Sequence, residues 1–393
     1  MEPQKTPDGA GTVIFVGLLW ITCWIGLLLF ASRIASRIPR LPPFVEDSLD
    51  ELGDLVSVIV PARNEEKAVE RGVRSILAQS YGNMEVIVVD DHSTDKTASI
   101  LDKIADEDPR VSILHSPPLR DGWLGKPSAQ SHGTDAARGE WLVFVDADII
   151  LHEHTISRAI QTAQARGLAG LTFIPKFISM SWSESGMVPL LPLAIAALRP
   201  DTANTPHGGG GFAAGAFILV SRDAYGTVGG HSCVKTEVID DIAFGKAMKR
   251  AKLPFRAFEG FDAAEVRMYY GAKSLLYGLA KNISFLLGGA KGRPWLAVFN
   301  AFFFCSAISM PLGLVVTGSL AGEVAVALVG LTGYMIPIAS VFAAGASLEY
   351  NARYLIFYPV AAWLIFLATL VAAYYMITRR TVLWRDREVR LAG

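Results

Sequence analysis

The feature that most constrains this chain is where its apolar residues lie, because they gather at the two ends of the sequence in stretches long enough to cross a bilayer. Residues 12–32 contain no charged side chain, and about 20 apolar residues are enough to span the hydrocarbon core. Three more apolar segments lie at about 296–318, 321–345 and 354–377. Residues 50–290 between them carry ordinary charge. The pattern predicts an amino-terminal anchor, a large polar domain and a carboxy-terminal hydrophobic cluster.

The same pattern predicts boundaries for the whole chain. They are an extracytoplasmic amino terminus at 1–11, an anchor at 12–32, a basic linker at 33–54, the polar domain at 55–270, an interfacial helix region at 271–295, a cluster of about three membrane segments at 296–377 and a basic tail at 378–393.

Charge next to the first apolar segment predicts its orientation. Arg33, Arg37 and Arg40 follow the segment, so the positive-inside rule puts the amino terminus outside and the polar domain in the cytoplasm of a multi-pass protein of the cell (inner) membrane. A cleaved signal peptide fits less well, since its apolar core would be shorter and its positive charges would come first. The tail is also basic and is predicted to be cytoplasmic. Three full crossings would leave it outside, so either one segment is re-entrant or a double pass, or the tail breaks the rule.

Composition excludes several function classes. The three cysteines, Cys23, Cys233 and Cys305, show neither a disulfide framework nor metal-ligand spacing. A net charge of −1 offers no footprint for nucleic acid. The basic residues beside the membrane segments suit anionic lipid head groups instead.

Short apolar runs alternate with helical patterns in the polar domain. Expected strands lie at 56–62, 85–91, 111–116 and 140–148, and expected helices at 64–80, 94–104, 126–137 and 153–164. This order is typical of a parallel sheet with helices on both faces, and strands without in/out alternation are expected to be buried on both faces. The predicted fold class is α/β.

Acidic residues follow three of the four expected strands. Glu65 follows the first, Asp91 the second, and Asp146 and Asp148 end the fourth. Ligands of such sheets bind outside the carboxyl ends of the strands. Two aspartates at i and i+2 of an extended segment point to the same side, and their oxygens suit Mg²⁺ or Mn²⁺ shared with phosphates. Helix capping is the competing interpretation, but a cap needs only one acceptor.

Two phosphate-binding classes are excluded. The run GGGGFAAG at 208–215 lacks the Gly-Lys-Ser/Thr ending of a P-loop, and no G-x-G-x-x-G follows the first strand.

Six stretches in order resemble the membrane-bound members of glycosyltransferase family 2, which have the GT-A fold. They are VSVIVPARNEE, VIVVDDHSTDKT, GWLGKPSA, FVDADI, GAFILVSRDAYGTVGG and VIDDIAFGKAMK. The resemblance implies that Asp146 and Asp148 form the DxD motif, with Asp148 on a metal that bridges the diphosphate of a nucleotide sugar. It implies that Glu65 and Asp91 hold the nucleobase and ribose, and that Asp241 is the general base.

Other residues are candidates for the same site. Arg63 is grouped with the donor-binding residues, and Lys126 is expected at the diphosphate as a point charge. Trp123 is a candidate for stacking on a sugar, and Gly210 belongs to a loop that would line the cleft. Asp240 either caps the helix that follows or faces the acceptor. His152, His207 and His231 are expected to be structural.

The acceptor is predicted to be a membrane lipid. Residues 181–200 and 267–289 are apolar segments interrupted by prolines or basic residues, as at a bilayer surface. The Q/R-x-x-R-W motif of ceramide glucosyltransferases and processive synthases is absent, so a processive polymerase is disfavoured. The chain instead resembles bacterial members associated with hopanoid and carotenoid-type lipids, and Arg267 and Lys281 are candidates to replace the missing arginine near the diphosphate.

The sequence therefore predicts metal-dependent transfer, with inversion, from a nucleotide sugar to a lipid hydroxyl, with a UDP-sugar favoured as donor. Two alternatives stay open. One is a phosphatase of the haloacid-dehalogenase type with Asp146 as nucleophile, although Ile150 stands where that family has Thr or Val. The other is an inactive membrane scaffold. The sugar, the lipid, the preferred metal and the oligomeric state are not predicted.

Overall fold

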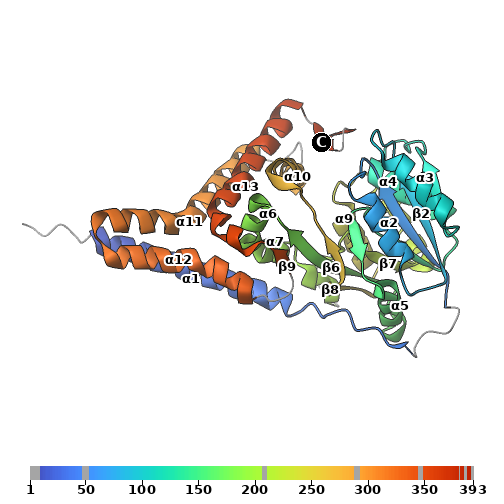
Figure 1. The fold of residues 1–393 in the computed structure, drawn as a ribbon, viewed down its shortest axis with the longest axis horizontal. Coiled ribbons are helices and arrows are strands. Elements are labelled where there is room, and N and C mark those ends of the chain that lie inside the picture. The colour runs from blue at the N-terminus through green and yellow to red at the C-terminus, as the bar shows by residue number, and fades with distance from the viewer. Residues whose placement is uncertain are drawn as a thin grey trace, which may run out of the picture.

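The computed structural model describes residues 9–46, 53–205, 210–286, 293–343, 348–379, 381–384 and 387–390. Apolar helices lie on one side of the molecule and an α/β domain lies on the other (Figure 1). The two parts are joined by short helices, by α10 and by one strand that the membrane part contributes to the sheet.

The centre of the α/β domain is one mixed sheet. Its strands are β1 (Val56–Ala62), β2 (Met84–Asp90), β3 (Val111–His115), β4 (Trp141–Phe144), β5 (Ile149–Leu151), β6 (Gly170–Ser179), β7 (Ile218–Ser221), β8 (Phe255–Val266) and β9 (Leu348–Tyr350). The order is β3-β2-β1-β4-β7-β6-β8-β5, with β9 on β6. The first four strands pair in parallel, as predicted. Beyond them the sheet is mixed, because β7 runs antiparallel to both β4 and β6; this agrees with the prediction of a sheet rich in parallel strands.

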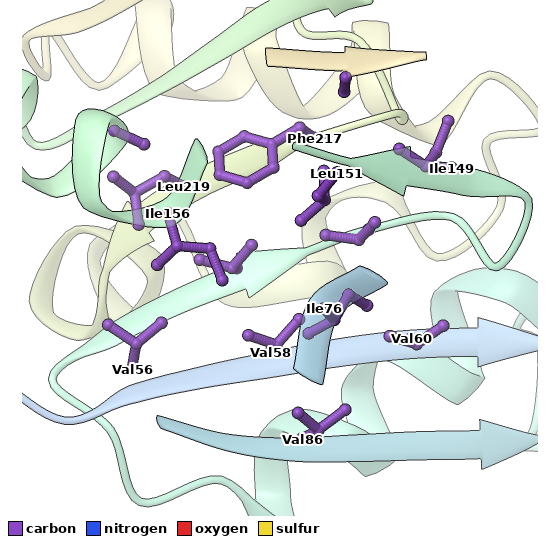
Figure 2. Close-up of a cluster of buried hydrophobic side chains, with 14 of the residues drawn as sticks. Val56, Val58, Val60, Ile76, Val86, Ile149, Leu151, Ile156, Phe217 and Leu219 are labelled. Carbon is purple, nitrogen blue, oxygen red and sulfur yellow. The ribbon is translucent and has the colours of Figure 1, made fainter. Parts of the chain in front are cut away.

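Helices cover both faces of the sheet. One face holds α2 (Val69–Leu77), α3 (Thr97–Glu107) and α5 (Thr155–Ala165), and the other holds α4 (Gly125–Ala136), α8 (Arg222–Thr227) and α9 (Asp240–Arg250). Val58 and Val60 of β1 pack in the first core and Ile59 in the second. Figure 2 shows the first core, where Val58 and Ile76 lie side by side. Burial on both faces explains why these strands read as unbroken apolar runs.

Four helical segments are long and apolar enough to cross a membrane. They are α1 (Gly9–Ala35), α11 (Pro294–Ala321), α12 (Val324–Ala343) and the stretch Ala352–Thr378, which contains α13 (Tyr358–Tyr374). Many of their large apolar side chains are exposed, as expected for a lipid-facing surface. The prediction of apolar helices at both ends of an α/β domain is confirmed.

Short elements join the two parts. Residues 181–200 fold into α6 (Trp182–Met187), a 3-10 turn and α7 (Leu191–Ala197), where α6 packs on α13 and α7 on α1. Helix α10 (Gly271–Leu286) follows β8 and packs along α13. After α13 come a π-helical turn (Tyr375–Arg379) and the hairpin β10 (Thr381–Trp384) and β11 (Arg387–Arg390).

Candidate functional site

The ends of β1 and β2 form one edge of the site. The strands are parallel and in register, with Ala62 opposite Asp90, so the residues that follow them are neighbours. The Arg63 guanidinium donates to the carbonyl oxygen of Asp91 at 2.5 Å. Asp91 is buried, and its carboxylate lies 3.1 Å from Nδ1 of His92. The structure therefore brings together Arg63 and Asp91, both predicted at the donor site.

The two loops after these strands are tied to each other. The side-chain oxygen of Asn64 accepts from the Thr94 amide at 2.8 Å, and Ser93 Oγ accepts from the Asn64 amide at 3.0 Å. Thr97 Oγ1 accepts from the amide of Glu65 at 2.8 Å. These three backbone amides thus have partners in the facing loop, which fixes Glu65 beside the end of β2.

A cluster of one cation and three carboxylates forms the centre of the site. Lys126 comes from the first turn of α4, Asp146 from the turn after β4, and Asp240 and Asp241 from the first turn of α9. Lys126 Nζ lies 2.7 Å from Asp146 Oδ1 and 3.9 Å from Asp240 Oδ1. We call these four residues the acid cluster. The Lys126 ammonium is therefore paired with carboxylates and is not a solvated surface group.

Gly215 completes the acid cluster from the backbone. Its amide donates to Asp241 Oδ2 at 2.7 Å. A Cβ at this position would lie 3.2 Å from Asp146 Oδ2, Asp241 Oδ2 and Lys126 Nζ. The lack of a side chain here therefore lets groups from three separate elements converge on one point.

Burial and mutual repulsion shape the charges of the cluster. Burial, with the charges of Asp241 and Asp146, raises the pKa of Asp240 to about 6 against the opposite effect of Lys126. Burial alone would lower the pKa of Lys126, but the three carboxylates raise it well above its ordinary value. Lys126 is thus a permanent cation among groups that carry a surplus of negative charge.

Two further glycines set the position of the carboxylates. A Cβ on Gly72 of α2 would lie 2.4 Å from the Ala147 carbonyl oxygen, so only glycine lets α2 press against the turn that holds Asp146. A Cβ on Gly245 of α9 would lie 2.4 Å from the Phe212 carbonyl carbon. Sequence reasoning missed Gly72, Gly215 and Gly245. An isolated glycine within a helical pattern is the signal that points to Gly72 and Gly245.

Asp146 and Asp148 do not lie on an extended strand, which corrects the prediction. Strand β4 ends at Phe144, and Ala147 and Asp148 form a turn before β5. The chain turns here because β5 leaves β4 and pairs with β8. Asp146 points into the acid cluster, and Asp148 is partly exposed.

The carboxylates of the site determine what kind of divalent-ion site it can form. Among the described residues, no group of three or more His, Cys, Asp or Glu side chains is arranged to hold a metal by itself. Asp146 points into the acid cluster and Asp148 lies two residues on in the same turn, and one or two carboxylates with substrate phosphates are the usual environment of Mg²⁺. The residues therefore fit an ion that arrives with a diphosphate, and not a closed protein-only site.

Gly210 and Trp123 precede Gly215 and Lys126 by a few residues along the chain. Gly210 is exposed, with φ +124°, and lies against Thr202. The chain then runs along α9 to Gly215; His207 lies outside the described residues. Trp123 is partly exposed, and the Arg120 guanidinium lies over its indole ring, 5.5 Å from the ring centre. The next amide, of Leu124, donates to Lys235 at 2.8 Å, which ties the start of α4 to the loop before α9.

Arg267 and Lys281 have different surroundings, although both were predicted near the diphosphate. Arg267 forms an ion pair with the buried Glu184 at 3.1 Å and stacks on Tyr270. Lys281 on α10 is within electrostatic reach of Lys126 and the three aspartates, and burial lowers its pKa to about 8. Of these two cations, Lys281 is the one that the structure associates with the acid cluster.

The two described histidines among the candidates have structural contacts. His231 is buried, its Nδ1 lies 2.8 Å from the Tyr225 hydroxyl, and burial lowers its pKa to about 3. His152 Nδ1 lies 3.0 Å from the Asp262 carbonyl oxygen.

Comparison with known proteins shows what the α/β domain is similar to. Residues 57–229 match the family model "Glycosyl transferase family 2". The chain is 27% identical over 292 residues to the 4,4'-diaponeurosporenoate glycosyltransferase of Staphylococcus haemolyticus (strain JCSC1435), covering 74% of this chain and 76% of that protein. The enzyme of the same name from Staphylococcus aureus (strain USA300) is 29% identical over 268 residues, covering 66% and 68%.

A solved structure has the same fold. The mannosyltransferase PcManGT from Pyrobaculum calidifontis, in complex with GDP-Man and Mn²⁺, superposes with a TM-score of 0.51 at 18% identity, covering 89% of this chain and 97% of that one. At this identity the likeness establishes the fold, so the predicted GT-A fold is confirmed. The family model and these relatives favour a glycosyltransferase over the alternative of a haloacid-dehalogenase phosphatase.

Proposed function

We propose that the protein is a family-2 glycosyltransferase that transfers a sugar from a nucleotide-sugar donor to the hydroxyl of a membrane lipid. The match of residues 57–229 to the family model and the apolar helices at both ends of the α/β domain support this. The observation that carries the proposal is the acid cluster, where Lys126, Asp146 and Asp241 converge at the carboxyl end of the sheet. That is where α/β sheets bind their ligands.

The donor nucleoside is proposed to bind at the ends of β1 and β2. Asp91 and Glu65 supply carboxylates for ribose hydroxyls and base amines, and Arg63 holds the loop by donating to the Asp91 backbone. Hydrogen bonds between the two loops fix their position relative to each other. Pre-ordered loops reduce the entropic cost of binding.

The diphosphate is proposed to lie between Asp146, Asp148 and the lysines. Asp146 and Asp148 would hold Mg²⁺ or Mn²⁺, which supplies Lewis-acid charge to the leaving diphosphate. Lys126 and Lys281 are the cations that the structure associates with this point. They would offset the negative charge that builds on the leaving group.

Asp241 is proposed as the general base. One of its oxygens accepts from Gly215 at 2.7 Å and the other from the Ile242 amide at 2.8 Å, which holds the carboxylate in one orientation. A carboxylate in hydrogen-bond reach of the acceptor hydroxyl can take its proton during attack. With no second nucleophilic carboxylate required, the sugar would be transferred in one displacement with inversion. Asp240 is more buried and lies nearer Lys126, so a charge-balancing role is proposed for it.

The acceptor is proposed to be an apolar lipid of the carotenoid or hopanoid type. Two similar proteins are named for 4,4'-diaponeurosporenoate, and α10 links the acid cluster to the apolar helix α13. The basic residues after α1 support an orientation with the catalytic domain in the cytoplasm. The donor is proposed to be a UDP-sugar, with GDP-Man, which PcManGT binds, as the first alternative.

The test is a donor and lipid screen with the full-length protein in nanodiscs. UDP-glucose, UDP-N-acetylglucosamine and GDP-Man are each incubated with a membrane lipid extract, with Mn²⁺, Mg²⁺ or a chelator. The expected result is release of the nucleoside diphosphate and a glycolipid identified by mass spectrometry, lost in Asp241→Asn. Absence of product with every donor would instead favour an inactive scaffold.

A further inference from the structure

Helix α13 is apolar over its whole length and is followed by a basic tail. A single crossing by α13 would carry that tail away from the catalytic domain. The contacts at the two ends of α13 decide whether it crosses.

The start of α13 is attached to the catalytic sheet. Strand β9 lies between α12 and α13 and pairs in parallel with β6, with Phe177 opposite Leu348. The Asn351 amide donates to the Ser179 carbonyl at 3.2 Å and also to Ser185 Oγ. The chain that enters α13 is therefore on the catalytic side, and α11 and α12 form a hairpin that leaves this side and returns to it.

The end of α13 is on the same side. Strand β10, which follows α13, packs against α10. Helix α10 begins where the Gly271 amide donates to Glu184 at 2.6 Å, and it carries Lys281 within electrostatic reach of the acid cluster. If α13 crossed the membrane, about 30 Å of hydrocarbon would separate its far end from α10 and the catalytic domain.

Helix α11 divides at Pro311 into two parts with different neighbours. Before the proline it packs on α13, where Cys305 Sγ donates to Ala362 at 3.2 Å and Trp363 Nε1 donates to Ser309 at 2.9 Å. After the proline it packs on α12, where a Cβ on Gly330 would lie 2.6 Å from the Val315 amide. A proline within a helix is a common cause of a change in helix direction. The second part runs with α12, and α1 contacts α11 just before the proline, where Trp20 Nε1 donates to the Ala307 carbonyl at 2.6 Å.

The helices that stay near the catalytic side share an exposed apolar surface. Its members include Tyr277, Trp295, Phe299, Phe303, Leu367 and Tyr374, each more than two-fifths exposed. Aromatic residues at the start of α11 and on α10 are typical of the level of the lipid head groups. Figure 1 shows α13 and α10 between the bundle of α1, α11 and α12 and the catalytic domain.

We propose that α10, residues 294–310 of α11, and α13 form a platform that inserts into the lipid leaflet on the catalytic side. Helix α13 does not cross the bilayer. The chain then crosses three times, through α1, α11 and α12. Because Pro311–Ala321 alone is about 16 Å long, α11 crosses with both parts: residues 294–310 run obliquely through the leaflet on the catalytic side, and Pro311–Ala321 runs through the opposite leaflet. The basic tail stays on the side of the catalytic domain, next to anionic head groups.

Sidedness is tested by cysteine labelling in sealed membrane vesicles with an impermeant maleimide. The background replaces Cys23, Cys233 and Cys305 by serine. Native Cys233, exposed on the catalytic domain, is restored as the catalytic-side control, and Glu323→Cys in the exposed α11–α12 turn is the far-side control. Arg387→Cys in β11 is the test. It is expected to label from the same side as Cys233, and labelling together with Glu323→Cys would overturn the proposal.

Two further measurements keep the test decisive. In the first, an epitope is added after Gly393 and the same vesicles are treated with protease. Its cleavage shows on which side the tail lies even if the maleimide cannot reach Arg387→Cys. Leu367→Cys on the exposed face of α13 is labelled in nanodiscs of the purified protein. Insertion in the leaflet predicts loss of labelling until detergent is added, whereas labelling at the rate of Cys233 would show an aqueous face and overturn the platform.

Discussion

Two carboxylate centres in the described part of the chain, the α6–α10 junction and the acid cluster, hold buried negative charge in opposite ways. At the α6–α10 junction, one carboxylate has many donors: Glu184 accepts from Arg267, from Ser181 Oγ at 2.6 Å and from the amides of Met180 and Gly271. In the acid cluster, three carboxylates share one ammonium, that of Lys126.

The difference separates a structural centre from a reactive one. At the junction, burial would raise the pKa of Glu184, but hydrogen bonds from Arg267 and Ser181 lower it, so the carboxylate is stably ionised. In the acid cluster the pKa of Asp240 is raised by burial and by the charges of Asp241 and Asp146, against the opposite effect of Lys126. A surplus of buried negative charge is costly unless a ligand compensates it. The first centre holds the fold together, and the second has a place for a cation and a donor.

The largest effect is expected from Asp241→Asn. The amide keeps the shape but cannot accept a proton, so the rate of transfer should fall about 10³-fold, within the usual range for loss of a general base. Binding of the nucleotide sugar, measured by isothermal titration calorimetry, should change little. Asp223→Asn, an exposed aspartate on α8, is the matched control and should transfer normally. Normal transfer by Asp241→Asn would place the base elsewhere.

The next effect is on stability, at the junction. Glu184→Ala removes the partner of Arg267 and leaves two backbone donors without their acceptor, so the free energy of unfolding should fall by about 3–5 kcal/mol. It is measured by thermal melting of the solubilised protein. The double variant Glu184→Leu with Arg267→Met should recover much of this loss, because no charge is then left unpaired. If the double variant melts as low as the single one, the ion pair is not what stabilises the junction.

The fold was predictable from sequence where burial alone decides it. The runs at Val56–Ala62 and Met84–Asp90 are apolar because both faces of those strands are covered, so the pattern shows them directly. Strand β9 has three residues and exists only because β6 offers a free edge. Its partner is about 170 residues away along the chain, and a pairing of that kind leaves no local signal.

The site was predictable to the same extent. Carboxylates at strand ends were found because a parallel sheet gathers its carboxyl ends at one edge. Gly215 was not found, because its contribution is the absence of a side chain. Arg267 and Lys281 looked alike in sequence; the difference between them depends on Glu184, 83 residues before Arg267.

Asp240→Asn is expected to raise the free energy of unfolding, by less than Glu184→Ala lowers it. When the pKa of a carboxyl group rises on folding, the folded protein loses stability as the pH increases from the group's ordinary pKa to its pKa in the folded state, here about 6. Asparagine avoids that cost, so at pH 8 without metal the variant should be more stable than the wild type by on the order of 2–3 kcal/mol, since one pKa unit is worth about 1.4 kcal/mol. The difference should vanish near pH 4. Equal melting curves at both pH values would mean that the cluster carries no surplus charge.

The smallest effect is expected at Lys281, and it tests whether α10 belongs to the reactive centre. Burial lowers the pKa of Lys281 to about 8, so its ammonium is present below that pH and is lost as the pH rises through it. If the ammonium supports the leaving diphosphate, transfer should fall about tenfold above this pH, the size expected for one charge-assisted hydrogen bond. Lys281→Arg keeps its charge and should remove the alkaline fall, whereas Lys273→Arg, an exposed lysine on the same helix, should leave it in place. An alkaline fall that persists in Lys281→Arg would assign it to another group and leave α10 as a structural element like the Glu184 junction.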